Sequence, residues 1–430
     1  MKLHALTGLA AAALSLVSAR IIAPLDPRVV YDGYRVYRVN THAALDSVES
    51  QIRHLRFVNF NPDTIDHLDL AVAPDDIDAF DALGLDAAVV HEDLGRDIHS
   101  EGPLRPYQRK TGSADLPDLE WFDSYHSYDD HLRFLEDLHL AFPDNSELVT
   151  AGESHEGRPI QGIHFWGENG KGGRPAVYWH ATVHAREWIT TMTVEYLMYQ
   201  LISGYLDGTE EVKAIVDAYD FYVLPVVNPD GFVHTQTTDR LWRKNRQPRG
   251  AETCVGTDVN RNWPHFWNVT GGASDDPCAQ TFRGLCPGDT AEMRSLVTFT
   301  DEVASANDDG IKLFIDWHSY GHLILLPYGG NCDARVENYE RQMELAAGTA
   351  RAVETVAGSK YVVGPVCDEL YAASGGSMDY VYDVAGAELA WAYELSPADA
   401  AGGGFVLPAD QILPTVVENW EGMRWLLATM

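Results

Sequence analysis

The stretch W-H-A-T-V-H-A-R-E-W-I, residues 179–189, combines two candidate metal ligands with a predicted transition from strand to helix. It follows an apolar run at 175–179 that predicts a buried strand, and it leads into an apolar-periodic run at 188–205 that predicts a helix. His184 and Glu187 are three residues apart and are both of a type that binds zinc, so they can turn toward one cation. Chance also produces this H-x-x-E spacing in a chain of 430 residues with 17 His. The alternative is a strand-end His followed by a Glu that the helix dipole favours.

Two more predicted strands end in residues that would complete a metal site. His318 follows the apolar run 312–317, and Glu394 follows the apolar run 389–393. Open α/β sheets form their sites at the carboxyl ends of strands, so we expect these side chains to meet His184 and Glu187. A lone strand-end His is more often a core residue. Two His, one Glu and an open fourth position, however, are the ligand set of a catalytic zinc.

The composition predicts a globular protein with one large domain and a smaller one, because 45% of the 430 residues are hydrophobic and 22% are charged. Residues 1–19 carry Lys2, an apolar run at 6–17 and small residues at 18 and 19, as a secretory signal does. The run is too short to span a bilayer. We therefore expect a secreted, extracellular protein; the alternative is a buried N-terminal helix.

The formal charge is −33, and the acidic residues are spread along the sequence. Such a surface repels nucleic acid and anionic lipid, so we expect neither as a partner, and we expect a monomer. The chain has five cysteines. Export favours disulfides, and an odd number leaves at least one thiol unpaired within the monomer.

The N-terminal part predicts a small two-layer α/β unit. Its expected order is strand 34–39, helix 45–57, strand 68–72, helix 74–83 and strand 87–90. Residues 101–116 follow, with prolines, glycines and the basic residues Arg105, Arg109 and Lys110. This composition is typical of an exposed linker that a protease can cut, although an ordinary interdomain connector remains an alternative.

A large α/β domain is predicted from Trp121 onward. Its further expected elements are helix 128–142, strands 148–153, 160–166 and 221–227, and helices 338–356 and 413–427.

Six motifs, in this order, resemble those of the secreted zinc metallocarboxypeptidases of the A/B type, in a zymogen arrangement. They are H-A-R-E-W-I (184–189), L-W-R-K (241–244), D-V-N-R-N-W (258–263), D-W-H-S-Y (316–320), L-Y-A-A-S-G-G-S-M-D (370–379) and Y-E-L (393–395). The resemblance runs from about Tyr34 to the C-terminus. It implies a large mixed eight-stranded sheet flanked by helices, preceded by a small ferredoxin-like prodomain. The implied domains are a signal peptide at 1–19, an activation propeptide with its linker at 20–112 and a catalytic domain at 113–430.

The resemblance also implies a role for each motif residue. One Zn²⁺ is bound by His184, Glu187 and His318; Glu394 is the catalytic carboxylate, and Arg243 steadies the oxyanion; Asn260, Arg261 and Tyr371 bind the terminal carboxylate of the substrate; Arg186 and Tyr320 belong to outer subsites; and Asp258 orients the first zinc histidine. The residue types suit these tasks. A carboxylate can move the proton of an attacking water, and a guanidinium binds a free carboxylate through two hydrogen bonds.

By the same resemblance, Met378 forms the floor of the pocket for the C-terminal side chain. The expected lining is Leu325, Gly329, Val366, Leu370, Ala373 and Ala392. An uncharged, adaptable Met predicts a preference for apolar or aromatic residues. Asp368 and Glu369 near the rim leave broader or basic specificity open. The resemblance pairs Cys254 with Cys278 and Cys332 with Cys367. It leaves Cys286 without a partner, so we expect a buried thiol there, with intermolecular pairing as the alternative.

We therefore expect a zinc-dependent exopeptidase that hydrolyses the C-terminal peptide bond of peptides or proteins and is activated by another protease. A catalytically silent binding protein of the same fold is an alternative, but the ligands, Glu394 and Arg243 are all present. An amidase or endopeptidase on this scaffold would lack the carboxylate clamp, and Asn260, Arg261 and Tyr371 argue against it.

Overall fold

The computed structural model describes residues 28–42, 44–61, 66–108, 115–251 and 254–430. The predicted signal peptide at 1–19 and the basic residues Arg109 and Lys110 of the linker lie outside these residues. Within the described part of the chain, no helix is both long and apolar enough to cross a membrane.

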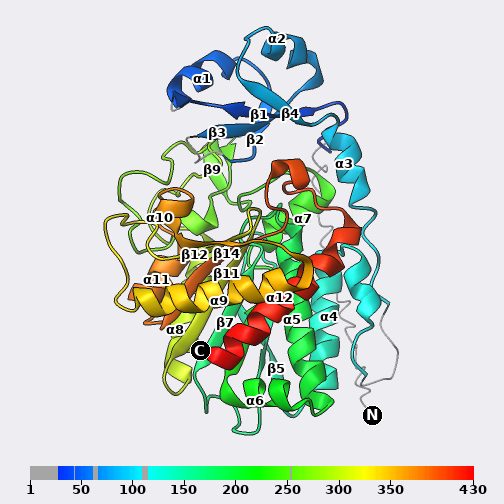
Figure 1. The fold of residues 1–430 in the computed structure, drawn as a ribbon, viewed down its shortest axis with the longest axis vertical. Helices are drawn as coiled ribbons and strands as arrows, with labels where there is room; N and C mark the ends of the chain where they lie inside the picture. Colours follow the sequence, from blue (N-terminus) through cyan, green and yellow to red (C-terminus); the bar gives the residue numbers. More distant parts are fainter. Residues whose placement is uncertain (1–27, 43, 62–65, 109–114, 252–253) are drawn as a thin grey trace, which may run out of the picture.

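A mixed eight-stranded sheet forms the centre of the large unit, as predicted (Figure 1). Its strand order is β13-β12-β14-β11-β7-β8-β6-β5. The four neighbouring strands β14, β11, β7 and β8 run parallel, whereas β6 and β5 are antiparallel to their neighbours. The bounds are β5 Ser146–Glu153, β6 Pro159–Phe165, β7 Ala176–Ala181, β8 Asp220–Leu224, β11 Ile311–Ser319, β12 Leu323–Leu326, β13 Val362–Pro365 and β14 Leu389–Leu395.

Both faces of this sheet are buried. Successive residues of a strand point to opposite sides, and the residues on each side belong to a hydrophobic core. Trp179 of β7 and Trp317 of β11 belong to the core under α5 (Trp188–Leu206), α9 (Tyr339–Ala357) and α12 (Ile412–Thr429). Tyr178, one position before Trp179, and Phe314, three positions before Trp317, belong to the core under α8 (Ala291–Ala306) and α11 (Ser377–Asp383). Burial on both faces explains why these strands read as continuous apolar runs in the sequence.

The other helices of the large unit complete its described part. They are α4 Tyr128–Ala141, α6 Glu210–Ala218, α7 Pro229–Thr237 and α10 Val366–Glu369, with short 3₁₀ turns at Leu119–Asp123, Val259–Arg261, Ala400–Gly402 and Ala409–Gln411. Helix α4 packs against β5 and β6. A small hairpin, β9 (Pro248–Ala251) and β10 (Cys254–Val255), lies outside the main sheet. Helix α4 begins as the sequence suggests, since the Ser127 side chain caps it by accepting from Asp130 N.

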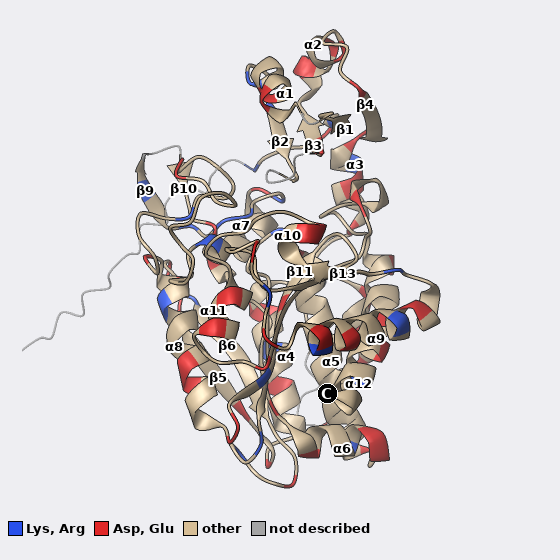
Figure 2. Ribbon diagram, turned by 60° about the vertical axis from the view of Figure 1, so that its left-hand side comes forward, with Lys and Arg blue, Asp and Glu red and all other residues tan. Residues whose placement is uncertain are grey.

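The N-terminal part forms a separate antiparallel sheet of order β2-β3-β1-β4. Its chain order β-α-β-β-α-β is that of a ferredoxin-like unit. The elements are β1 Arg35–Asn40, α1 Leu45–Ile52, β2 Phe57–Asn59, β3 His67–Val72, a 3₁₀ turn Pro74–Asp76, α2 Ile77–Asp81, β4 Ala87–His91 and α3 Leu94–Ser100. Figure 1 places this small unit at one end of the molecule, and Figure 2 shows Asp and Glu distributed over the helices of both units.

Two N-terminal predictions are wrong in detail. The helix expected to reach Phe57 ends at Ile52, and Phe57–Asn59 is an edge strand instead. The reason is tertiary, because backbone pairing of Phe57 with Val72 outweighs the local apolar spacing. The linker was expected to be exposed from Glu101 onward, but Glu101 is only 2% exposed and forms an ion pair with Arg240 of the large unit.

Candidate active site

The connection between β7 and α5 carries the first two ligand candidates. His184 and Glu187 lie between Ala181, where β7 ends, and Trp188, where α5 begins. Thr182 turns the chain here with φ of +58°, and its hydroxyl accepts from or donates to Thr190 and Thr191. His184 therefore stands a few residues beyond the strand, not at its last position as the sequence suggested.

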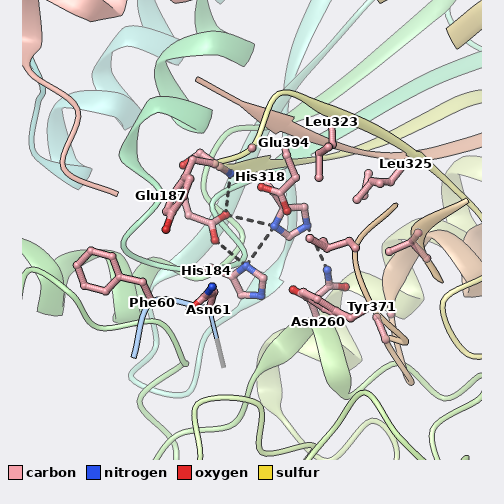
Figure 3. A pocket seen from close by; sticks show the side chains of 18 of the residues that line it. Phe60, Asn61, His184, Glu187, Asn260, His318, Leu323, Leu325, Tyr371 and Glu394 are labelled. Carbon is pink, nitrogen blue, oxygen red and sulfur yellow. Dashed lines mark hydrogen bonds and ion pairs between the residues drawn. The ribbon is translucent and has the colours of Figure 1, made fainter. Parts of the chain in front are cut away.

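His318 and Glu394 lie within strands. They occupy β11 and β14, near the carboxyl ends of both, and face each other in the register of this parallel pair. Strand β7 lies on the other side of β11. The sheet thus brings four side chains from three chain segments to one edge, as expected (Figure 3).

Three of these side chains converge closely enough to hold one metal ion. Atoms of His184, Glu187 and His318 lie within 4.8 Å of one another, and all three residues are buried. His184 Nδ1 is 2.8 Å from Glu187 Oε1 and 3.1 Å from His318 Nδ1, which is 3.2 Å from Glu187 Oε2. Donors around a tetrahedral zinc are separated by about 3.3 Å. The two imidazoles direct nitrogens at one point beside a carboxylate, so the donor set fits zinc.

The electrostatics of the two carboxylates differ. Burial alone would raise the pKa of Glu187, but His184 and His318 lower it to about 2, so Glu187 is charged at neutral pH. Burial raises the pKa of Glu394 to about 8, against the opposing effect of His318. Glu394 Oε2 is buried without a hydrogen-bond partner among the described residues, which leaves it open to a water or a substrate.

Asp258 joins the ligand cluster to the basic side of the site. Its Oδ1 lies 3.2 Å from His184 Nε2, and its Oδ2 accepts from Arg243 Nε and Nη2 at 3.0 and 2.8 Å. Arg243 is 6% exposed and lines the cavity in front of the cluster. A carboxylate on the outer nitrogen of a metal-binding histidine fixes the orientation of its ring. Asp258 therefore contacts the first histidine of the cluster, the residue that it was expected to orient.

The three residues expected to bind a substrate carboxylate line the same cavity. Arg261 donates from Nε to Gly272 O at 2.6 Å and from Nη1 to Asn260 O at 3.0 Å. Its guanidinium carbon lies 5.8 Å from the ring centre of Tyr371. Figure 3 shows Asn260 and Tyr371 at the cavity wall, across from Glu187.

A hydrophobic recess adjoins this group. Met378 is 6% exposed, and it lines the cavity with Leu323, Leu325, Val366, Leu370, Ala373 and Ala392. Gly329, expected among them, does not line the cavity; its amide donates to Asp379. Asp368 and Glu369 also lie outside the lining, and Asp368 pairs with Arg335 at 2.6 Å. The missed lining residue Asp379 stands beside Met378 in the motif, and burial raises its pKa to about 6.

The small unit forms part of the wall of the cavity, which measures about 380 Å³. Phe60 and Asn61, which follow β2, line it together with the ligand cluster. Arg186 is fully buried, donates from Nη2 to Phe60 O at 3.1 Å, and stacks on Phe405, 3.8 Å from the ring centre. Tyr320 packs against the same Phe405 ring, with centroids 4.9 Å apart. Arg186 thus contacts Phe60 of the small unit, and both Arg186 and Tyr320 pack on Phe405 of the large unit. The sequence patterns did not indicate these contacts.

The cysteines pair as expected, with bonds between Cys254 and Cys278 and between Cys332 and Cys367. The expectation of a buried thiol at Cys286 is wrong, because Cys286 is exposed. It lies beside Leu285, which is 71% exposed, so this part of the loop faces solvent although both side chains are apolar.

Residues 131–422 match the family model described as zinc carboxypeptidase. The chain is 42% identical over 427 residues to a probable metallocarboxypeptidase A of Trichophyton verrucosum, covering 98% of this chain and 97% of the relative. It is 36% identical over 350 residues to carboxypeptidase A2 of Rattus norvegicus, covering 81% and 79%. The crystal structure of carboxypeptidase A from Helicoverpa armigera superposes with a TM-score of 0.79 at 27% identity, covering 93% of this chain and 98% of that chain.

Proposed function

The chain belongs to the zinc carboxypeptidase family, and from this premise we propose that it is a secreted exopeptidase, made as a zymogen, that removes apolar or aromatic residues from peptide C-termini. That it is a metallocarboxypeptidase, a hydrolase of peptides, follows from the family. The observation that supports the finer proposal is the single cavity lined by the ligand cluster, Glu394, the carboxylate-binding group and Met378.

His184, Glu187 and His318 are proposed to hold the zinc, which supplies an activated water and polarises the scissile carbonyl when bound. Glu394 then takes the proton of the attacking water and gives it to the leaving amine. Its raised pKa of about 8 suits both transfers, because a general acid and base is most effective when its pKa lies near the working pH. Burial with an unpaired Oε2 keeps this carboxylate available.

Arg243 is proposed to face the oxyanion of the tetrahedral intermediate. Asp258 holds its Nε and Nη2, so the guanidinium is fixed before the substrate arrives. Loss of one such donor typically costs about 3 to 4 kcal/mol of transition-state stabilisation.

Asn260, Arg261 and Tyr371 are proposed to clamp the free carboxylate of the substrate, which confines cleavage to the last peptide bond. Hydrogen bonds from a cation bind a carboxylate more strongly than neutral donors do, and a guanidinium can form two of them at once. The anchoring of Arg261 by Gly272 O and Asn260 O supports this role, since the guanidinium is held at the cavity wall. Specificity is assigned to Met378 and its apolar neighbours, which present no charge to the last side chain.

The small unit is proposed to act as an inhibitory prodomain. Phe60 O occupies a donor of Arg186, and Phe60 and Asn61 stand in the cavity, so a peptide must displace them. Cleavage within the linker, which carries Arg109 and Lys110, would release the unit. Secretion rests on the signal-like sequence at 1–19 and agrees with the two disulfides.

One experiment tests the whole proposal. Blocked dipeptides that differ in their last residue are incubated with the precursor before and after limited trypsin treatment, each with and without a zinc chelator. Hydrolysis should require the cut and the metal and should be fastest for Phe or Leu. Activity of the intact precursor equal to that of the cut chain would contradict the zymogen, and faster release of Arg would contradict the role of Met378.

A further inference from the structure

Asp316 lies directly behind the second histidine of the ligand cluster. Its Oδ2 is 3.0 Å from His318 Nε2, whereas His318 Nδ1 faces His184 and Glu187. Asp316 precedes His318 by two positions in β11, so both side chains stand on the same face of the sheet. Asp316 is fully buried, and water therefore does not compete for its carboxylate.

The same oxygen also accepts from two residues of the substrate cavity. Asn260 Nδ2 donates to Asp316 Oδ2 at 2.9 Å, and Ser377 Oγ donates to it at 2.5 Å. Ser377 N donates to Asn260 Oδ1 at 2.9 Å, which closes a ring of three residues. Asn260 belongs to the proposed carboxylate clamp, and Ser377 directly precedes Met378. One buried oxygen thus connects the ligand cluster, the clamp and the floor of the pocket.

The second oxygen of Asp316 faces His180 on the neighbouring strand. His180 Nε2 lies 2.9 Å from Asp316 Oδ1, the two residues are register partners of β7 and β11, and both are fully buried. Within the described ranges the ring nitrogens of His180 form no hydrogen bond of acceptable geometry, so the contact with Asp316 is an ion-pair contact. A buried carboxylate requires partners on both oxygens, and these contacts supply them.

We propose that Asp316 is a positioning residue that fixes His318 for zinc and Asn260 for the substrate carboxylate at the same time. The inference rests on the proposed function and extends it. The carboxylate lies 3.0 Å from Nε2 as an ion-pair partner, and Asn260 Nδ2 lies 3.1 Å from the same nitrogen, so both groups hold the ring with its Nδ1 toward His184 and Glu187. By accepting from Nδ2, it holds the Asn260 amide at the cavity wall. Zinc affinity and recognition of the chain end are therefore coupled through one side chain.

Asp316→Asn tests this coupling, because it keeps the size of the side chain and removes its charge. The dissociation constant for Zn²⁺ is measured on the full chain by competition with a chromogenic chelator, and the visible absorption of the Co²⁺ form reports the ligand geometry. We expect the dissociation constant to rise about 10- to 100-fold, as for other carboxylates that orient metal-binding histidines, together with a changed Co²⁺ spectrum. In the trypsin-cut chain at saturating zinc, KM for a peptide should rise by a larger factor than kcat falls.

Asp220→Asn is the matched control. Asp220 is 1% exposed and lies 3.1 Å from His164 Nε2, so it also forms a buried carboxylate–imidazole pair. It is the first residue of β8 and lies at the amino end of the parallel strands, whereas the ligand cluster lies at their carboxyl ends. This variant should retain the zinc affinity, the Co²⁺ spectrum and the KM of the wild type, even where its melting temperature falls.

The outcomes separate the inference from the proposed function. A wild-type chain that binds no zinc or releases no residue contradicts the proposed function itself. A functional wild type with unchanged zinc affinity and KM in Asp316→Asn overturns the role of Asp316 alone. If this variant does not fold, Ser377→Ala decides, since it removes one donor and leaves the charge. In Ser377→Ala, a smaller rise of the dissociation constant for Zn²⁺ and of KM supports the proposal, and unchanged values of both refute it.

Discussion

His318 and Glu394 are register partners on the adjacent parallel strands β11 and β14. The pairing sets a ligand candidate and the proposed catalytic carboxylate side by side at one edge of the sheet (Figure 3). Because both strands run through the buried centre of the fold, neither side chain can shift without disturbing the core. The separation between His318 and Glu394 is therefore fixed by the sheet and not by a loop.

Replacing Glu394 by Gln is expected to leave zinc bound and to lower kcat by at least about 100-fold, since general acid and base catalysis contributes a factor of about 10² to 10⁴. Glu394 is not among the three converging ligands, so metal content should stay unchanged. The check is steady-state kinetics with metal analysis of the same sample. Near-normal turnover would remove Glu394 from the mechanism.

Removal of the metal by a chelator is expected to abolish hydrolysis and to lower the melting temperature. A ligand at 1,000 times its dissociation constant stabilises the folded state by about 4 kcal/mol, and this contribution disappears with the metal. Activity and melting temperature are measured before chelation, after it and after readdition of ions. Zn²⁺ should restore both, whereas Mg²⁺, which prefers oxygen ligands, should not. Retained activity in the chelated, dialysed chain would contradict a zinc enzyme.

Met378→Asp is expected to change the preference from Phe toward Arg at the substrate C-terminus. An acid in this recess would pair with a basic side chain, and a hydrogen bond to a charged group contributes about 1.5 to 3 kcal/mol, or roughly a 10- to 100-fold change in the ratio of kcat/KM values. Met378→Leu is the control and should keep the apolar preference. An unchanged Phe-to-Arg ratio in the Asp variant would place the specificity pocket elsewhere.

Arg261→Lys is expected to raise KM for peptides with a free C-terminus about 10-fold or more, because an ammonium cannot replace the two-pronged contact of a guanidinium. A peptide amidated at its C-terminus is the matched substrate. The wild type should discriminate strongly against the amide, and the variant should discriminate less. Equal loss for both peptides would indicate a general structural defect and not a lost clamp.

Glu101→Gln is expected to weaken the attachment of the small unit. Both carboxylate oxygens of Glu101 accept hydrogen bonds from the Arg240 guanidinium, and both residues are almost fully buried. Removing one partner of a buried ion pair costs about 3 to 5 kcal/mol when the other charge stays behind. After trypsin treatment the released fragment should dissociate faster, as followed by size-exclusion chromatography and by the lag before full activity. Glu92→Gln, which removes an exposed partner of Arg35 within the small unit, should not change the lag.

The sequence by itself determined the chemistry and the main layers. The apolar runs predicted the central strands β7, β11 and β14, because a strand buried on both faces leaves no polar alternation. The periodic run after Glu187 predicted α5 almost to the residue. The six motifs, through their resemblance to a known family, predicted a zinc carboxypeptidase.

Only the tertiary structure decided which distant groups meet. It turned Phe57–Asn59 into a strand by pairing it with β3, buried Glu101 against Arg240, and exposed Cys286. It also brought Asn260, Ser377 and His318 onto the carboxylate of Asp316. Local periodicity reports only how neighbouring residues alternate. Contacts between segments depend on strand order and register, which arise from packing of the whole chain.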